Sequence, residues 1–345
     1  MSPEERARVA AIGRDRPPEP GEYVELPAGI LWLRLPIPGA LRHINVWLVP
    51  GDRGWFLVDT GMRTDAVKLA WERYERSLPL ASQLESIVVT HHHPDHFGMG
   101  RWLGERFGVG IAMSADAAAA AADSLSEGRS DMGNAAAGFA TRLGVEIDTE
   151  MLAILVGAGY RAIVSGQPET ELLPAGGHVP EPVGRWRISI HDGHAPGHAC
   201  LHDDAGHVLI SGDQVLPTIS SNISLYPSNE AGDPLGDYLH SLDRLATLPG
   251  DTLVLPAHGR PFVGLHERLA ALRSEHRERL ESIAVLCASP RSTREVTAGL
   301  FSLDRLDALN RLLATTETLA HLRRLELGGL VARRGQGADL RWEAA

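Results

Sequence analysis

The chain has 345 residues, more than one hydrophobic core usually organises, so we expect a large domain with a smaller companion. Its 43% hydrophobic and 22% charged residues are typical of a globular protein and exclude a largely disordered chain. The formal net charge of −11 disfavours a polyanion such as nucleic acid as the main partner, because phosphate binding depends on Lys and Arg.

Residues 1–24 form a charged, proline-containing leader that lacks the apolar segment of a secretory signal. No run of roughly 18 apolar residues occurs in the sequence, which argues against a membrane-spanning helix. The two cysteines, Cys200 and Cys287, lie far apart and outside any CxxC pattern, as expected of reduced thiols. We therefore predict a soluble, cytoplasmic protein with no membrane partner.

Strands and helices alternate through the first three-quarters of the chain. Branched and aromatic runs over 44–49 and 55–58, separated by a Gly-Asp-Arg-Gly turn, predict a hairpin. Helical spacing of apolar residues covers 64–78, and a short buried strand over 86–90 ends directly in His91. Further strands are expected at 109–113, 185–190, 207–211 and 252–256, and helices at 99–107 and 235–247. This alternation indicates layered α/β structure.

Residues 115–180 interrupt that alternation. Helix-prone, alanine-rich stretches over 115–126, 134–144 and 149–163 replace the strands. The insertion either covers an edge of the sheet or forms a lid over a pocket. Its apolar character suits an acyl chain or an aromatic acid better than a phosphate backbone. The side chains concerned are Met132, Phe139, Met151, Leu152, Ile154, Leu155 and Tyr160.

Residues 266–345 are expected to form a separate unit. Helical periodicity covers 266–287, and the turn after Pro290 offers a helix cap that Glu295 completes. Further helices are expected over 303–312 and about 315–327. Two short strands over 330–334 and 339–342, joined by a Gly-Gln-Gly turn, would then form a wing, so the pattern predicts a winged helix.

Winged helices often bind DNA through a basic recognition helix. Here the candidate helix, over 314–327, carries Arg323 and Arg324 but also Glu317 and Glu326. We therefore favour a unit that packs on the catalytic part or on a second subunit, which leaves a homodimer open, over one that binds nucleic acid.

The most informative segment is THHHPDHFG, which starts at residue 90. In an extended segment, residues i and i+2 project to the same face, so His91 and His93 can converge on one metal ion. After the proline bend, Asp95 and His96 can point to a neighbouring position. Imidazole and carboxylate are the ligands that zinc takes while leaving positions for water. A histidine-rich surface loop is the plainer alternative, but the place of the segment at the end of a buried strand favours a metal site.

This segment resembles the HxHxDH signature of the metallo-β-lactamase superfamily, and the resemblance extends over about residues 25–260. The other matching motifs are Val58-Asp59-Thr60-Gly61, His194-Ala195-Pro196-Gly197-His198, Ser211-Gly212-Asp213 and Leu255-Pro256-Ala257-His258-Gly259. The resemblance implies a four-layer αββα sandwich over 25–262, with the helical insertion at 115–180, followed by the unit at 266–345.

The resemblance further implies a site for two metal ions, zinc with iron or manganese as alternatives. The implied ligands are His91, His93 and His198 for one ion, Asp95, His96 and His258 for the other, and Asp213 as a bridge. Asp95 and Asp213 would be the catalytic carboxylates, and Asp59 would brace the site from beside the ligands. The ions would share a water whose pKa falls to roughly 7, and the resulting hydroxide would be the nucleophile. His194, which precedes the ligand loop, is expected to be structural or to lie just outside the ligands, and His92, between two ligands, is expected to face the opposite way.

Several chemistries of the superfamily use such a site. Asp213 argues against β-lactam hydrolysis, and His93 argues against the oxygen-reducing diiron members; persulfide dioxygenases stay a minor alternative. The THHHxDH segment resembles hydroxyacylglutathione hydrolases, although the chain lacks their basic helical end. We predict a dinuclear hydrolase of a small acyl thioester or related ester. Lactone hydrolysis, or RNA or DNA phosphodiester cleavage with the winged helix for docking, is the alternative. Asn222 and Tyr226, in the loop after Asp213, are expected to contact the substrate.

Overall fold

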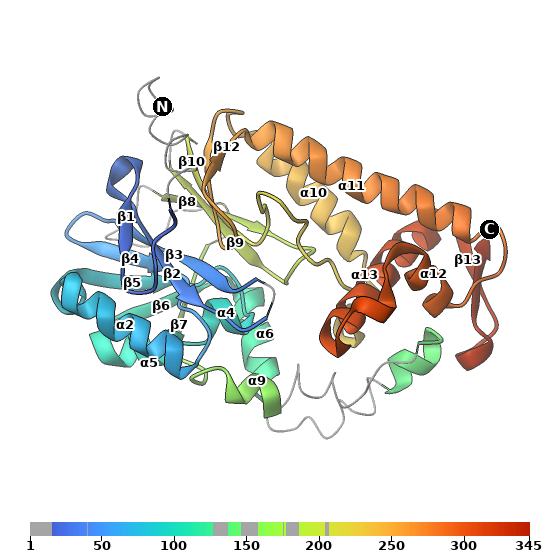
Figure 1. The fold of residues 1–345 in the computed structure, drawn as a ribbon, viewed down its shortest axis with the longest axis horizontal. Helices are drawn as coiled ribbons and strands as arrows, with labels where there is room; N and C mark the ends of the chain where they lie inside the picture. Colours follow the sequence, from blue (N-terminus) through green and yellow to red (C-terminus); the bar gives the residue numbers. More distant parts are fainter. Residues whose placement is uncertain are drawn as a thin grey trace.

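A computed structural model describes residues 16–39, 41–126, 137–145, 158–174, 176, 186–203 and 207–345 of the chain. Two β-sheets face each other in the first part, and helices from the end of the chain gather beside them (Figure 1). Cys200 and Cys287 are both buried free thiols. No helix within the described ranges is both long and apolar enough to cross a bilayer.

The first sheet has seven strands among the described residues, and they follow the order of the chain. They are β1 (Tyr23–Glu25), β2 (Leu31–Pro36), β3 (His43–Pro50), β4 (Trp55–Val58), β5 (Leu84–Val88), β6 (Gly110–Met113) and β7 (Thr170–Leu172). The first four pair antiparallel and the rest parallel, so the predicted β3–β4 hairpin is confirmed. Because β1 begins at Tyr23, the end of the expected leader belongs to this sheet.

The second sheet has five described strands in the order β12-β11-β10-β9-β8. They are β8 (Trp186–His191), β9 (His198–Asp203), β10 (Val208–Gly212), β11 (Leu253–Pro256) and β12 (Phe262–Val263). Strands β10 and β11 run parallel, whereas the other pairs run antiparallel. Because these two strands run parallel, the residues that follow Gly212 and Pro256 lie side by side at the C-terminal ends of the strands.

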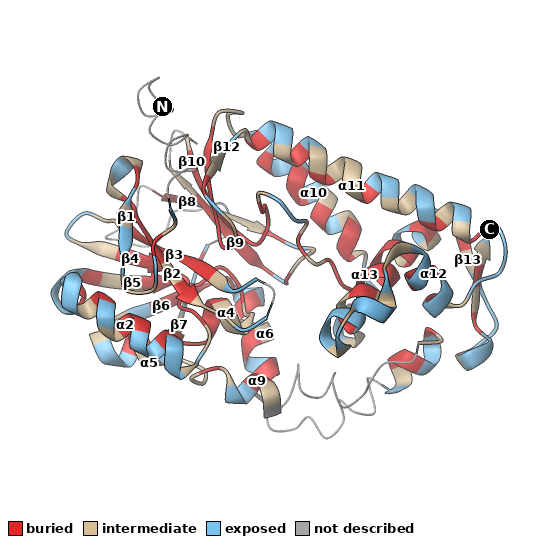
Figure 2. Ribbon diagram, viewed as in Figure 1, coloured by how far each residue is buried: buried red, intermediate tan, exposed pale blue. Residues whose placement is uncertain are grey.

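Alternating side chains give each sheet two apolar faces and hence three packed interfaces. Trp32 and Trp47 of the first sheet pack toward Trp186 and Leu201 of the second. Helices α2 (Asp65–Ser77) and α5 (Gly100–Phe107) cover the outer face of the first sheet. Helices α10 (Pro234–Leu245) and α11 (Leu265–Leu286) cover the second (Figure 2). The four-layer αββα architecture implied by the resemblance is therefore confirmed.

Helix α2 shows how the sequence specifies these outer layers. The Thr64 side chain accepts a hydrogen bond from the Val67 backbone N–H, which caps the first turn. Every third or fourth residue is then buried, so one stripe of the helix faces the sheet. The remaining described helices of the first part are α3 (Leu80–Gln83), α4 (Pro94–Phe97), η1 (Pro27–Gly29) and η2 (Pro227–Asn229).

The insertion is only partly described. Its described elements are α6 (Ala115–Leu125), a helical segment over 137–142, α9 (Ala158–Ala162) and the edge strand β7, which the pattern did not predict. Met132, Met151, Leu152, Ile154 and Leu155 lie outside the described residues. Phe139 is buried in the core beside the C-terminal helices, and Tyr160 is buried against the first sheet. The insertion thus contacts both parts of the molecule.

The C-terminal unit consists of α12 (Thr293–Leu300), η3 (Leu303–Arg305), α13 (Ala308–Leu327), β13 (Val331–Arg334), η4 (Gly337–Asp339) and β14 (Arg341–Ala344). Ser292 and Glu295 form the predicted cap of α12. The prediction of two helices over 303–312 and 315–327 is wrong, because α13 is continuous. The Thr318 hydroxyl donates to the Ala314 carbonyl four residues earlier, so this buried polar group is satisfied within the helix.

Candidate metal centre

Seven His and Asp side chains converge where loops leave the ends of the strands. His91 and His93 follow β5, and Asp95 and His96 lie on the short helix α4 that continues the same loop. His194 lies between β8 and β9. Asp213 and His258 follow the parallel strands β10 and β11, whose shared direction brings the two side chains together.

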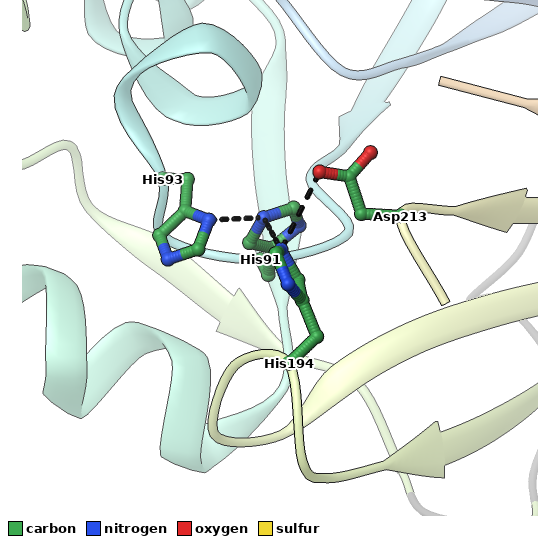
Figure 3. A group of neighbouring side chains, drawn as sticks. All are labelled: His91, His93, His194 and Asp213. Atoms are coloured by element: carbon green, nitrogen blue, oxygen red, sulfur yellow. Dashed lines mark hydrogen bonds and ion pairs between the residues drawn. The ribbon is translucent and has the colours of Figure 1, made fainter. Parts of the chain in front are cut away.

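The first group consists of His91, His93, His194 and Asp213, whose nearest donor atoms all lie within 4.8 Å of one another. The Nε2 atom of His91 lies 2.9 Å from Nδ1 of His93 and 3.3 Å from Nε2 of His194. His194 Nε2 also lies 3.4 Å from Asp213 Oδ2. Figure 3 shows the three rings turned toward one another, with the carboxylate beside them.

The second group consists of Asp95, His96 and His258, again with donor atoms within 4.8 Å of one another. His258 Nε2 lies 3.4 Å from Asp95 Oδ2 and 3.4 Å from Asp213 Oδ1. His96 Nε2 lies 3.5 Å from Asp213 Oδ2. Asp213 therefore faces both groups, which is the position that a bridging carboxylate requires.

Hydrogen bonds on the outer side of the rings fix which nitrogen points inward. The Nδ1–H of His96 donates to Asp59 Oδ2 at 2.8 Å, and that of His258 donates to the His43 carbonyl at 2.9 Å. The Nδ1–H of His194 donates to the Asn222 carbonyl at 2.9 Å. Because carbonyl and carboxylate oxygens only accept, each ring keeps an unprotonated Nε2 for the centre when it is neutral.

These residues fit a metal ion chemically as well as geometrically. Imidazole nitrogens and carboxylate oxygens are the donor set that zinc takes in catalytic sites. The buried Nε2 of His96 and Oδ1 of Asp213 have no hydrogen-bond partner within the described part of the chain. Buried polar atoms without a partner are costly, and a cation between the two groups would satisfy both.

Asp59 supports the second group without facing it. Its side chain is 2% exposed, and its Oδ1 accepts hydrogen bonds from the backbone N–H and the hydroxyl of Thr90. Its Oδ2 accepts the Nδ1–H of His96. Asp59 has a left-handed backbone with φ of 63°, a conformation that Asp tolerates better than most residues. This backbone turns the carboxylate from the end of β4 toward α4.

The carboxylates divide the histidines into two electrostatic classes. Burial, followed by the neighbouring imidazoles, lowers the pKa of His91 and His93 well below the ordinary value. Burial would also lower the pKa of His258, but the carboxylates of Asp213 and Asp95 outweigh it and raise that pKa to about 10. Asp59, Asp95 and Asp213 likewise raise the pKa of His96. Without a cation the centre therefore holds protons, which a metal ion would displace.

His194 lies in the first donor group, whereas His198, which the resemblance implied as a ligand, lies in neither group among the described residues. His198 is the first residue of β9, and its Nε2 accepts the backbone N–H of Asp213 at 3.1 Å. Its ring stacks on that of His91, with the centroids 4.8 Å apart. A Cβ atom on Gly212 would approach the His198 ring to 2.6 Å, so this histidine packs against bare backbone. The pair Gly-His occurs twice in this segment, which allows two alignments of the motif.

The side chains of Asn222 and Tyr226 contact the C-terminal unit. The Asn222 Nδ2 donates to Glu317 Oε2 at 3.3 Å, and only its backbone carbonyl reaches His194. The pKa of Tyr226 is raised by burial of its hydroxyl, which bonds with Ser224 and Thr316. The sequence motifs thus predict that this loop lies near the centre, but they do not predict the direction of its side chains. His92 belongs to neither donor group among the described residues.

Comparison with known proteins places these features in a family. The sequence model of the metallo-beta-lactamase superfamily matches residues 39–258, and that of the metallo-beta-lactamase-like C-terminal domain matches residues 280–344. The chain is 28% identical over 311 residues to the probable metallo-hydrolase YqjP of Bacillus subtilis (strain 168). This match covers 86% of the chain and 92% of that protein.

Two solved structures are similar along nearly the whole chain. A beta-lactamase domain protein from Burkholderia ambifaria is 35% identical, with a TM-score of 0.85 and coverage of 97% of this chain and 100% of that one. A metallo-beta-lactamase family protein from Thermus thermophilus is 29% identical, with a TM-score of 0.79 and coverage of 93% and 100%. Both similarities include the C-terminal unit as well as the sandwich.

Proposed function

The chain belongs to the metallo-β-lactamase superfamily of metallo-hydrolases, and from that premise we propose that it hydrolyses a small acyl thioester or a related ester with two metal ions. The observation that carries this proposal is the position of Asp213, whose two oxygens face both donor groups. In this proposal His91, His93 and His194 hold one ion and Asp95, His96 and His258 hold the other. Zinc suits these donors, and iron and manganese are alternatives.

Two bound cations would supply Lewis-acid charge for the scissile carbonyl and would lower the pKa of a coordinated water to roughly 7. The residues of the chain supply geometry. Asp59, Asn222 and His43 each accept an Nδ1–H and thereby hold a ligand ring in one orientation. With these groups in place, the site requires no serine or cysteine nucleophile.

The insertion supports a small substrate with an apolar part. The hydroxyl of Tyr160 donates to the backbone carbonyl of His92, between two of the donor residues. The insertion therefore stands directly beside the centre, and in the proposal it forms one wall of the acyl site. Phe139 and Tyr160 are themselves buried in the two cores, so they anchor the insertion and do not contact the substrate in this proposal.

The C-terminal unit gives less support to phosphodiester cleavage. Arg323 and Arg333 both pair with Glu326, Arg324 pairs with Asp233, and Arg334 pairs with Glu343. Arginines that already pair with carboxylates offer little charge to a phosphate backbone. We therefore place lactone hydrolysis, which uses the same carbonyl chemistry, ahead of nucleic-acid cleavage as the second candidate.

The test is thiol release from a panel of acyl-CoA and acylglutathione thioesters by zinc-loaded protein, with Asp213→Ala as the control. We expect metal-dependent release confined to one acyl class. The variant should lose at least about 10³-fold in turnover, because several kcal/mol of transition-state stabilisation disappear with the bridging carboxylate. Absence of release from every thioester by fully loaded protein would overturn the thioester assignment.

A further inference from the structure

The loop between β10 and α10 connects the candidate metal centre with the C-terminal unit. We propose that Glu317 on α13 is a positioning residue for the centre, because it anchors Asn222 and thereby fixes the carbonyl that orients His194. This inference rests on the proposed metal function of His194.

The first contact between the loop and the metal centre is a hydrogen bond from His194 to Asn222. The Nδ1–H of His194 donates to the Asn222 carbonyl at 2.9 Å, while its Nε2 faces His91 and Asp213. A ring held by one hydrogen bond takes its orientation from the acceptor. A shift of the Asn222 carbonyl would therefore turn Nε2 away from the other donors.

The second contact fixes that carbonyl to α13. The Asn222 Nδ2 donates to Glu317 Oε2 at 3.3 Å, and the Ser224 hydroxyl donates to Asn222 Oδ1 at 2.6 Å. Ser224 also bonds with the Thr316 hydroxyl at 2.8 Å, and the Leu225 backbone N–H donates to the Thr316 carbonyl at 3.0 Å. The loop is thus bonded to one turn of α13 by both its side chains and its backbone.

Burial of a carboxylate such as Glu317 costs free energy, because the charge loses its contact with water. Glu317 is 8% exposed, and burial raises its pKa, while the Arg279 guanidinium and the Asn222 amide oppose that shift. Arg279 on α11 forms an ion pair with its Oε1, which leaves Oε2 for Asn222. A buried ion pair adds little net stability compared with apolar residues of similar volume. We therefore assign the ion pair a positioning role, because Glu317 holds the loop that orients His194.

The chain offers a matched control on the same helix. Glu326 pairs with Arg323 and Arg333, so both of its carboxylate oxygens bond within the C-terminal unit rather than to the loop that carries Asn222. The change Glu326→Gln therefore removes the same charge as Glu317→Gln, but away from the metal centre. Comparison of the two separates positioning of His194 from a general loss of stability in the C-terminal unit.

The experiment measures zinc affinity by competition with a chelator, together with the visible spectrum of the cobalt-substituted protein and the melting temperature of the metal-free protein. We expect Glu317→Ala to weaken the binding of one of the two zinc ions by about 10–100-fold, which is the usual effect of removing a group that orients a ligand. Glu317→Gln should lose less, because its amide oxygen still accepts from Asn222. Asn222→Ala should match Glu317→Ala, and the double variant should lose no more than either alone. In each affected variant the cobalt bands should shift.

The outcomes are separable. If wild-type protein binds two zinc ions and both Glu317 variants keep both affinities and the cobalt spectrum, the positioning role is overturned. An equal loss of affinity in Glu326→Gln would also overturn it, since the effect would then be one of stability. If wild-type protein binds no zinc, the metal function itself fails. Should Glu317→Ala not fold, Asn222→Ala, which removes the same contact from the loop side, decides between the two outcomes.

Discussion

Among the residues that the structure describes, histidines meet in the metal centre and in a second buried pair, and the second pair belongs to no metal-binding group. Between α11 and α13, the Nδ1–H of His321 donates to the Glu317 carbonyl at 2.8 Å, and its Nε2 accepts from Nδ1 of His276 at 3.1 Å. The two rings stack with their centroids 5.2 Å apart. In this pair the inward nitrogens bond to each other, whereas in the metal centre they face shared space.

The difference lies in the carboxylates. Burial, with help from Arg279, lowers the pKa of His276 to about 4, and burial lowers that of His321 to about 3. In the metal centre, Asp213 and Asp95 outweigh burial and raise the pKa of His258 to about 10. Without neighbouring carboxylates that outweigh burial, His276 and His321 form a neutral pair whose inward nitrogens bond to each other. The metal centre has, in addition, carboxylates among the rings and oxygen acceptors that fix the outer nitrogens.

The largest effect on metal binding and turnover should distinguish His194, which lies in the donor group, from His198, which does not. We expect His194→Ala to lose one ion and at least about 10³-fold in turnover, because it removes a donor of the first group. His198→Ala should keep two ions bound but destabilise the fold by about 1–3 kcal/mol, because the Asp213 N–H loses its acceptor. Metal content and chemical unfolding measure the two effects. The opposite result would restore His198 as the ligand.

A smaller effect should follow from Asp59→Asn. The amide keeps the size of the side chain but removes the charge that His96 Nδ1 contacts at 2.8 Å. We expect the ion of the second group to bind about 10–100-fold more weakly, with the first group unchanged. Stepwise chelator competition resolves the two ions. Unchanged affinity at both would show that the Asp59 carboxylate does not tune the centre.

The smallest effect concerns the neutral pair and should leave metal binding untouched. A histidine in the unfolded chain has a pKa near 6.5, while that of His276 in the fold is about 4. The unfolded state therefore binds the extra proton first. The stability held by a neutral His276 is fully present above pH 6.5 and is lost as the pH falls toward 4, at about 1.4 kcal/mol per pH unit.

His276→Gln keeps a donor for His321 but removes this titration. We expect its free energy of unfolding to fall less between pH 6.5 and 5 than that of the wild type, by about 1–2 kcal/mol. Urea unfolding at several pH values provides the measurement, with bound zinc counted in parallel. Identical pH slopes for the two proteins would contradict a buried, neutral His276.

Local patterns predicted much of the fold, and the misses have physical causes. The hairpin of β3 and β4, helix α2 and the capped start of α12 were predicted because alternation, helical spacing and a capping box are local signals. Strand β9 was missed because HACLHD lacks clear alternation, and the 20-residue helix α13 was divided at its threonines.

In the candidate site too, some residues could be predicted from local motifs and others could not. Most donor residues follow strand ends, so their motifs are visible in the sequence. The repeated Gly-His pair, however, leaves the alignment of His194 and His198 open until β9 is placed. The contact between Asn222 and Glu317 spans 95 positions and leaves no local pattern at all. Side-chain direction in the loop after β10 depends on α13 and could not be predicted from the loop alone.

The most direct test of the metal centre is a crystal structure of zinc-loaded protein with anomalous diffraction collected at the zinc edge. We predict two peaks, one among His91, His93 and His194 and one among Asp95, His96 and His258, with Asp213 between them and no peak at His276 and His321. Absence of peaks at the centre, or a peak at the His276–His321 pair in its place, would contradict this prediction.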